Sequence, residues 1–139
     1  MNEEQTNLLQ SAAQAARMAY APYSNFRVGA AVQTPGGVFL GANIETASTN
    51  LGICAERAAI THARMRGENE ILGIAVSCPD ALQDEDGRVD EYGAMPCGAC
   101  RQWLAELAPK AWVVISSSDK VYYLDDILPC AFQLYISKD

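Results

Sequence analysis

The amino-acid sequence predicts an α/β fold, a three-layer α/β/α sandwich whose central sheet is mixed. Three observations support this. The 139 residues are 50% hydrophobic and 19% charged, which predicts a single domain over residues 1–139 with one core. A strand hairpin is predicted near the start of the chain. Beyond it, helix patterns alternate with strand patterns, an order typical of helices packed on a sheet.

The chain opens with a predicted amphipathic helix over residues 4–20, ended by Pro22. The spacing of apolar residues then changes from a helical to a strand pattern, and residues 26–32 and 38–40 are predicted to be strands. Between them, Thr34-Pro35-Gly36-Gly37 is a turn sequence, so the two strands should form a hairpin.

A second helix is predicted over residues 54–66, ended by Gly67. Residues 71–76 form a continuous apolar run, which is typical of a strand covered on both faces. Residues 79–94 hold six acidic side chains against one arginine and are predicted to be a solvated surface loop. This loop lacks the ligand order of a calcium site.

After Pro96, a third helix is predicted over residues 97–107, followed by a strand over residues 112–116. A last strand over residues 121–123 and a short turn over residues 125–128 complete the predicted elements.

The charge balance restricts the partners. With 10 basic and 17 acidic residues the net charge is −7, and no nucleic-acid partner is expected, because phosphate binding needs clustered Lys and Arg. No apolar run approaches the roughly 20 residues of a membrane span, so no membrane partner is expected. Residues 1–6 are acidic and polar, unlike a secretory signal, and we expect a protein of the reducing cytoplasm.

The five cysteines, Cys54, Cys78, Cys97, Cys100 and Cys130, are an odd number that argues against a disulfide framework. Cys54 and Cys97 stand at predicted helix starts, where thiolates are stabilised, and Cys97 and Cys100 can direct both sulfurs to one metal ion. We therefore predict Zn²⁺ on Cys54, Cys97 and Cys100. Three protein ligands leave one tetrahedral position for water, as in catalytic zinc sites. Cys78 and Cys130 are predicted to be core thiols.

Charged residues beside these cysteines complete the predicted site. Glu56 can reach the open side of the metal and pass a proton from water to a substrate nitrogen. Three thiolates and one Zn²⁺ carry a net negative charge. Arg57 and Arg101, each next to a ligand, are predicted to offset it by donating hydrogen bonds to the sulfurs.

Taken in order, these motifs resemble the zinc deaminases, and most closely the small cytidine deaminases. The resemblance covers nearly the whole chain, through the segments Ala19-Tyr20-Ala21-Pro22-Tyr23-Ser24, Phe26-Arg27-Val28-Gly29-Ala30-Ala31, Asn43-Ile44-Glu45, Gly52-Ile53-Cys54-Ala55-Glu56-Arg57, Pro96-Cys97-Gly98-Ala99-Cys100-Arg101-Gln102 and Leu128-Pro129-Cys130-Ala131-Phe132. It implies hydrolytic deamination of cytidine and deoxycytidine to uridine and deoxyuridine, with release of ammonia, in pyrimidine salvage. Glu56 would shuttle protons to N3 and to the leaving amino group.

The resemblance also assigns the substrate contacts. It places Asn43 and Glu45 on the ribose hydroxyls, although the residues alone would equally allow strand-end capping. It places the Ala55 backbone and the Phe26 ring at the base, and Phe132 at the base of a neighbouring subunit. Small members of the family are commonly homotetramers with shared active sites, so we expect a homotetramer that binds a small-molecule nucleoside.

The chain departs from the family after Glu45, in the loop over residues 79–94 and in the tail over residues 133–139. Residues 46–49 are Thr-Ala-Ser-Thr, where the family often has Asn-Ala-x-Tyr, so a tyrosine of the base pocket is missing. The wider pocket that this implies extends the expected substrates to modified cytosine nucleosides. The loop over residues 79–94 resembles in length that of the blasticidin S deaminases, which act on a cationic cytosine nucleoside. An acidic rim attracts such a substrate, so deamination of this antibiotic is the alternative function.

Two other classes of protein compete with this interpretation. A thiol oxidoreductase would use Cys97-Gly-Ala-Cys100, but that class needs a strand directly before the motif, where an acidic loop stands here. A structural zinc module would need Cys78 or His62 as a fourth ligand. Cys78 ends a predicted buried strand, and His62 is interpreted as an ordinary helix residue.

Overall fold

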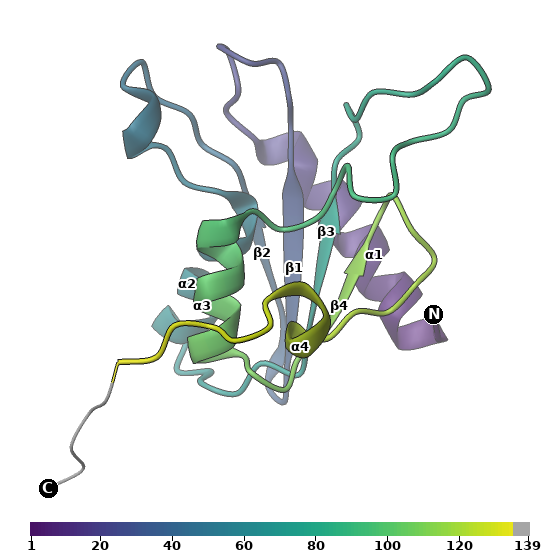
Figure 1. The fold of residues 1–139 in the computed structure, drawn as a ribbon. Helices are drawn as coiled ribbons and strands as arrows, with labels where there is room; N and C mark the ends of the chain where they lie inside the picture. Colours follow the sequence, from purple (N-terminus) through teal and green to yellow (C-terminus); the bar gives the residue numbers. More distant parts are fainter. Residues whose placement is uncertain (135–139) are drawn as a thin grey trace, which may run out of the picture.

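The computed structural model describes residues 1–134, and residues 135–139 of the predicted domain lie outside the described part. A four-stranded sheet with the order β2-β1-β3-β4 forms the centre of the molecule (Figure 1). Its strands are β1 (Gly29–Thr34), β2 (Gly37–Ala42), β3 (Gly73–Ser77) and β4 (Trp112–Ile115). The sheet is mixed, as predicted, because β1 pairs antiparallel with β2 and β3, whereas β3 pairs parallel with β4.

The predicted hairpin is confirmed. Strands β1 and β2 meet at the pair Thr34 and Gly37, and the turn is closed by Gly37, whose φ of 134° favours glycine. At the other end of β1, Gly29 faces both Ala42 and Ser77. This register brings the loops before β1, after β2 and after β3 to one end of the sheet.

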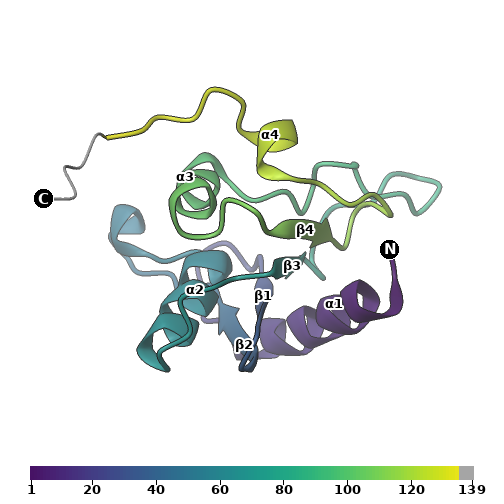
Figure 2. The ribbon, with the colours of Figure 1, turned by 90° about the horizontal axis from the view of Figure 1, so that it is seen from below.

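Helices cover both faces of the sheet. Helix α1 (Glu3–Ala15) lies on one face, where Leu8 and Ala12 pack with Ala31, Ala75 and Val114. Helices α2 (Ala55–Met65) and α3 (Gly98–Leu107) lie on the opposite face, as Figure 2 shows. The three-layer α/β/α sandwich is therefore confirmed.

Two glycines let helices approach the sheet closely. A Cβ at Gly29 would lie 1.9 Å from the Ala12 carbonyl oxygen, and one at Gly41 would lie 2.3 Å from the Ala59 nitrogen. Any side chain at these positions would push α1 or α2 off the sheet. Gly41 therefore fixes the depth of α2, whose first turn carries predicted site residues.

Several predicted elements need correction. The first helix ends at Ala15 and continues only as a 3₁₀ turn, η1 (Ala16–Met18). The predicted strand over residues 121–123 is reduced to a single bridge between Tyr122 and Val113. The turn that follows is a short helix, α4 (Leu124–Ile127). A second 3₁₀ turn, η2 (Thr49–Leu51), precedes α2.

The remaining segments agree with prediction in type but not in all bounds, because β1 begins at Gly29 rather than at residue 26 and β3 at Gly73 rather than at residue 71. Gly67, with a φ of 84°, follows α2, and every residue of β3 is buried. Residues 79–94 form a loop that projects from the same end of the sheet as the loops before β1 and after β2 (Figure 1). Among the described residues, none of the helices is both long and apolar enough to span a bilayer.

Candidate active site

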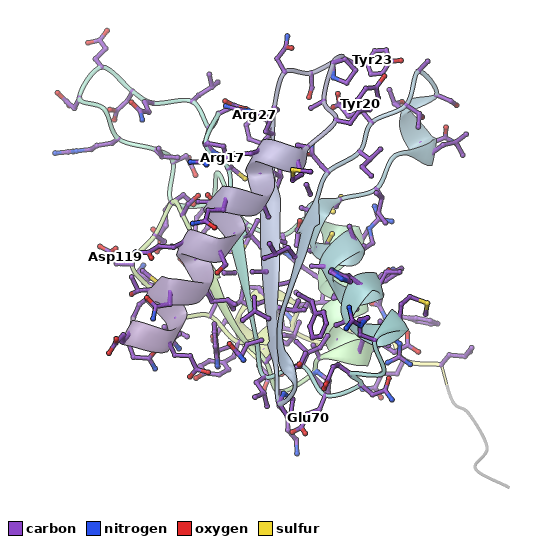
Figure 3. All side chains as sticks on the ribbon, turned by 180° about the vertical axis from the view of Figure 1, so that it is seen from behind. Arg17, Tyr20, Tyr23, Arg27, Glu70 and Asp119 are labelled. Carbon is purple, nitrogen blue, oxygen red and sulfur yellow. The ribbon has the colours of Figure 1, made fainter. Side chains whose placement is uncertain are left out.

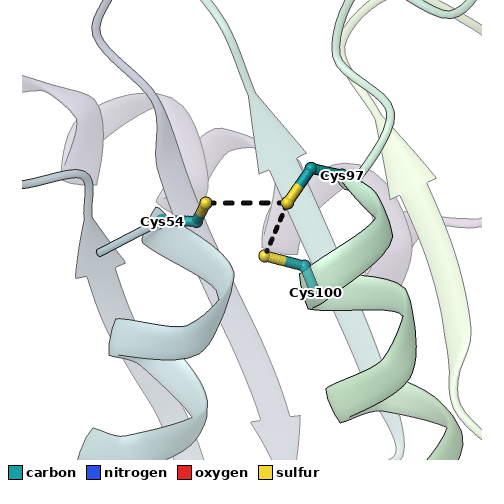
Figure 4. A group of neighbouring side chains, drawn as sticks. All are labelled: Cys54, Cys97 and Cys100. Atoms are coloured by element: carbon teal, nitrogen blue, oxygen red, sulfur yellow. Dashed lines mark hydrogen bonds between the residues drawn. The ribbon is translucent and has the colours of Figure 1, made fainter. Parts of the chain in front are cut away.

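Two helix starts place the three predicted ligands next to one another. Cys54 is the N-cap residue of α2 and Cys97 is the N-cap residue of α3, both with extended backbone. Cys100 lies in the first turn of α3 and is buried. Figure 4 shows the sulfurs of all three cysteines in the space between the two helix starts.

The spacing of the sulfurs suits zinc. The Sγ atom of Cys97 lies 3.7 Å from that of Cys54 and 3.6 Å from that of Cys100, and all three lie within 4.8 Å of one another. A tetrahedral zinc site with Zn–S bonds of about 2.3 Å separates its sulfurs by about 3.8 Å. Within the described residues, neither Cys78 nor His62 joins this group. The three cysteines are therefore positioned to bind one metal ion together, as predicted for zinc.

The predicted alternatives for a fourth ligand have other environments. His62 Nδ1 lies 3.0 Å from the Leu40 carbonyl oxygen, and its ring packs edge-on against Phe39. Cys78 is buried, as predicted, and burial raises the pKa of its thiol to about 12. Cys130, however, is exposed, with a φ of 55°, so the prediction of a core thiol there was wrong.

The environment of Cys54 favours the thiolate. The neighbouring Cys100 thiol, followed by Arg57, lowers the pKa of Cys54 to about 5, against the opposing effect of burial. Arg57 Nη2 donates a hydrogen bond of 3.4 Å to the Cys54 sulfur, and its guanidinium lies 6.0 Å from the centre of the Trp103 ring. The thiolate is the form that binds zinc.

Arg101 does not make the predicted contact. Its Nε donates to the Pro96 carbonyl oxygen and its Nη1 to the Ile127 carbonyl oxygen, each at 2.8 Å. Its described hydrogen bonds therefore go to backbone rather than to sulfur. Arg101 ties the start of α3 to the end of α4, because the guanidinium reaches both carbonyl groups at once.

Glu56 lies on the first turn of α2, between Cys54 and Arg57 in sequence. Its side chain is only 4% exposed, and burial is the main cause that raises its pKa. A buried carboxyl group beside a metal site is suited to accept and donate protons.

Cys54, Cys97 and Glu56 border a cavity of about 490 Å³, a size typical of small-molecule sites. It opens at the end of the sheet where the three loops meet. Its apolar part combines the residues Phe26, Val28, Ile53, Val76, Cys78, Ala94 and Met95. Its polar part includes Tyr23, Asn43, Glu45, Thr46, Thr49, Asn50, Glu56 and Arg57.

Asn43 and Glu45 line the cavity and also hold its walls. The Asn43 amide donates to the Phe26 carbonyl at 2.9 Å and accepts from the Val28 N–H at 2.8 Å. Glu45 Oε1 accepts from the N–H groups of Tyr23 and Ser24, both at 3.1 Å. These bonds are the capping contacts that the residues alone allowed.

Of the remaining predicted substrate contacts, the structure places two at the cavity and one outside it. Phe26 and Ala55 line the cavity, whereas Phe132 does not and is 70% exposed near Gln102. Sequence reasoning missed Ala94 and Met95, which end the acidic loop and line the cavity. Their position directly before Pro96-Cys97 was the available signal.

A buried carboxyl group beside three clustered cysteines defines the zinc deaminase class. Residues 2–116 match the family model for the cytidine and deoxycytidylate deaminase zinc-binding region. The chain belongs to the cytidine deaminase family, and zinc is its cofactor.

Similar proteins agree with this assignment. A cytidine deaminase of Halalkalibacterium halodurans is 46% identical over 103 residues, which cover 73% of this chain and 70% of that protein. A cytidine deaminase of Mycobacterium tuberculosis is 38% identical over 127 residues, covering 89% and 86% of the two chains. The crystal structure of cytidine deaminase from Burkholderia pseudomallei matches with a TM-score of 0.75 and 40% identity, covering 95% of this chain and all of that one.

Proposed function

We propose that this protein deaminates cytidine and deoxycytidine by hydrolysis, giving uridine or deoxyuridine and ammonia, in pyrimidine salvage. The observation that carries the proposal is the position of Glu56, buried in the first turn of α2 and lining the same cavity as Cys54 and Cys97. In this arrangement, the Glu56 carboxyl group and the metal site can act on the same bound base.

The residues divide the chemistry between them. A zinc ion held by Cys54, Cys97 and Cys100 would supply an activated water for attack on C4 of the base. Glu56 accepts one proton of the attacking water and passes it to N3. It then takes the remaining proton from the hydroxyl now on C4 and delivers it to the amino group, so that the C4–N bond breaks, a C4 carbonyl forms and ammonia leaves. Arg57 holds the Cys54 sulfur during this sequence through its hydrogen bond of 3.4 Å.

The substrate is a nucleoside without phosphate. Within residues 1–134, Arg57 is the only basic residue that lines the cavity, and its guanidinium is already bonded to Cys54. A phosphate group would therefore enter without a free cation to bind it. Asn43 and Glu45 bind the ribose hydroxyls, and Phe26 with the Ala55 backbone holds the base.

A homotetramer supplies Phe132 to the site. This ring is 70% exposed in the single chain and lies outside its own cavity, so it is available to a neighbouring subunit. Small size, acidic charge and reduced cysteines are consistent with a cytoplasmic enzyme. Light scattering of the purified protein tests the assembly, and a fully active monomer contradicts it.

The acidic loop gives little support to a cationic substrate such as blasticidin S. Asp80 pairs with Arg27, Glu91 pairs with Lys120, and the Asp84 carboxylate accepts backbone N–H groups of its own loop. Gly93 and Ala94 of the loop line the cavity together with the next residue, Met95, and none of the three carries a charge. Cytidine therefore remains the preferred substrate of the proposal.

Release of ammonia from a panel of substrates tests the proposed function. The panel contains cytidine, deoxycytidine, deoxycytidine monophosphate, 5- and N4-substituted cytidines, adenosine and blasticidin S. We expect turnover of the first two and little of the monophosphate, adenosine or blasticidin S. Zinc-loaded, folded protein that is inactive on both plain nucleosides would overturn the proposal.

A further inference from the structure

The segment Phe26-Arg27-Val28 forms a wall of the cavity and is held by side chains on both sides. On one side, Asn43 binds the Phe26 carbonyl and the Val28 N–H. On the other side, Asp80 accepts hydrogen bonds from the backbone N–H of Arg27 at 2.9 Å and from its Nε and Nη2 at 2.8 Å. Backbone groups of three successive residues are thus fixed by two side chains.

Asp80 is itself anchored where it makes these bonds. It lies three residues after Ser77, the last residue of β3, which pairs with Gly29 at the start of β1. The carboxylate is 24% exposed, and the hydrogen bonds from Arg27 lower its pKa to about 2, so it is ionised at neutral pH. Figure 3 shows Arg27 at the loop end of the molecule, together with Tyr20 and Tyr23 and opposite to Glu70.

The other end of the acidic loop is also attached to the body of the protein. Glu91 Oε1 accepts from Lys120 Nζ at 2.6 Å and from the Tyr122 hydroxyl at 3.1 Å. The Ser117 hydroxyl donates to the Glu91 carbonyl at 2.8 Å and accepts from the Ala94 N–H at 3.1 Å. Both ends of the loop are therefore held by hydrogen bonds to the rest of the protein. Asp80 is consequently held in place where it binds the segment Phe26-Arg27-Val28.

We infer that Asp80, acting through Arg27, is a positioning residue that holds the Phe26 wall of the cavity in the shape that binds the nucleoside. Neither residue lines the cavity, so neither contacts the substrate. Loss of the pair loosens Phe26 and weakens substrate binding, while Glu56 and the cysteines, on other elements, keep their geometry. This inference rests on the proposed function for its substrate, and on the described contacts for the positioning itself.

Asp80→Asn and Arg27→Gln test the inference, with Glu85→Gln as the matched control. Glu85 is an exposed acidic residue of the same loop and makes none of the described hydrogen bonds. We expect KM for cytidine to rise about three- to ten-fold in either variant, with kcat within two-fold of the parent and zinc content unchanged. The double variant should resemble each single one, because both remove the same interaction.

Hydrogen exchange supplies a readout that needs no substrate. Amides of residues 26–28 should exchange several-fold faster in Asp80→Asn and Arg27→Gln, and at the parental rate in Glu85→Gln. Unchanged exchange in both variants, or faster exchange with KM unchanged, overturns the inference, as does a fall in kcat alone. A parent enzyme without cytidine turnover overturns the proposed function instead, and the exchange rates then still decide whether Asp80 holds this segment.

Discussion

The first turns of α2 and α3 carry the same pattern, a cysteine ligand directly or closely followed by an arginine, yet the arginines are used differently. Arg57 bonds the Cys54 sulfur, whereas Arg101 bonds the carbonyl groups of Pro96 and Ile127. The start of α2 also carries Glu56, while the start of α3 carries a second ligand, Cys100. The start of α2 is therefore suited to proton transfer and charge balance. The start of α3 is suited to holding two ligands in fixed positions.

The largest effect is expected from the ligands, which both helix starts share. Cys54→Ala, Cys97→Ala and Cys100→Ala should each lose zinc and all measurable turnover, because two thiolates alone do not complete the site. Cys78→Ala is the control, since Cys78 borders the same cavity but stands apart from the cluster. Mass spectrometry measures the zinc content of each variant. Zinc loss in Cys78→Ala would indicate a closed structural site with four ligands instead.

Glu56→Gln separates proton transfer from metal binding at the α2 start. The amide has the shape of the carboxyl group but cannot shuttle protons, so kcat should fall roughly 10²–10⁴-fold. Zinc content and the circular dichroism spectrum should match the parent. Normal turnover in this variant would rule out Glu56 as the proton carrier.

Arg57→Met tests whether the α2 arginine serves the metal site. Loss of the hydrogen bond to the Cys54 thiolate should weaken zinc binding or activity roughly 10–100-fold, as for other partners of metal ligands. Arg57→Lys keeps the charge and should recover part of the loss. Competition with a chelator measures the affinity, and an unchanged value together with unchanged kcat/KM would contradict this role.

The sequence predicted these features unequally, for physical reasons. The hairpin and the fully buried β3 follow from patterns within a few residues, and both are confirmed. The three predicted ligands stand in two short motifs, and the fold brings their sulfurs together. The bond from Arg101 to Ile127 and the pair between Arg27 and Asp80 join positions 26 and 53 residues apart, so only the folded chain reveals them. Exposure of Cys130 likewise depends on where the chain runs after α4.

The smallest effect on catalysis is expected at the α3 arginine, where the effect on stability should dominate. Arg101→Met removes two hydrogen bonds of 2.8 Å from a charged donor to carbonyl groups that remain partly buried. This should lower the free energy of unfolding by roughly 2–3 kcal/mol. The melting temperature should then fall by roughly 5–10 °C. Calorimetry at one protein concentration measures the change, with Arg57→Met as the comparison. If Arg101→Met instead loses zinc while its melting temperature stays at the parental value, the two arginines share one role and the contrast between the helix starts is wrong.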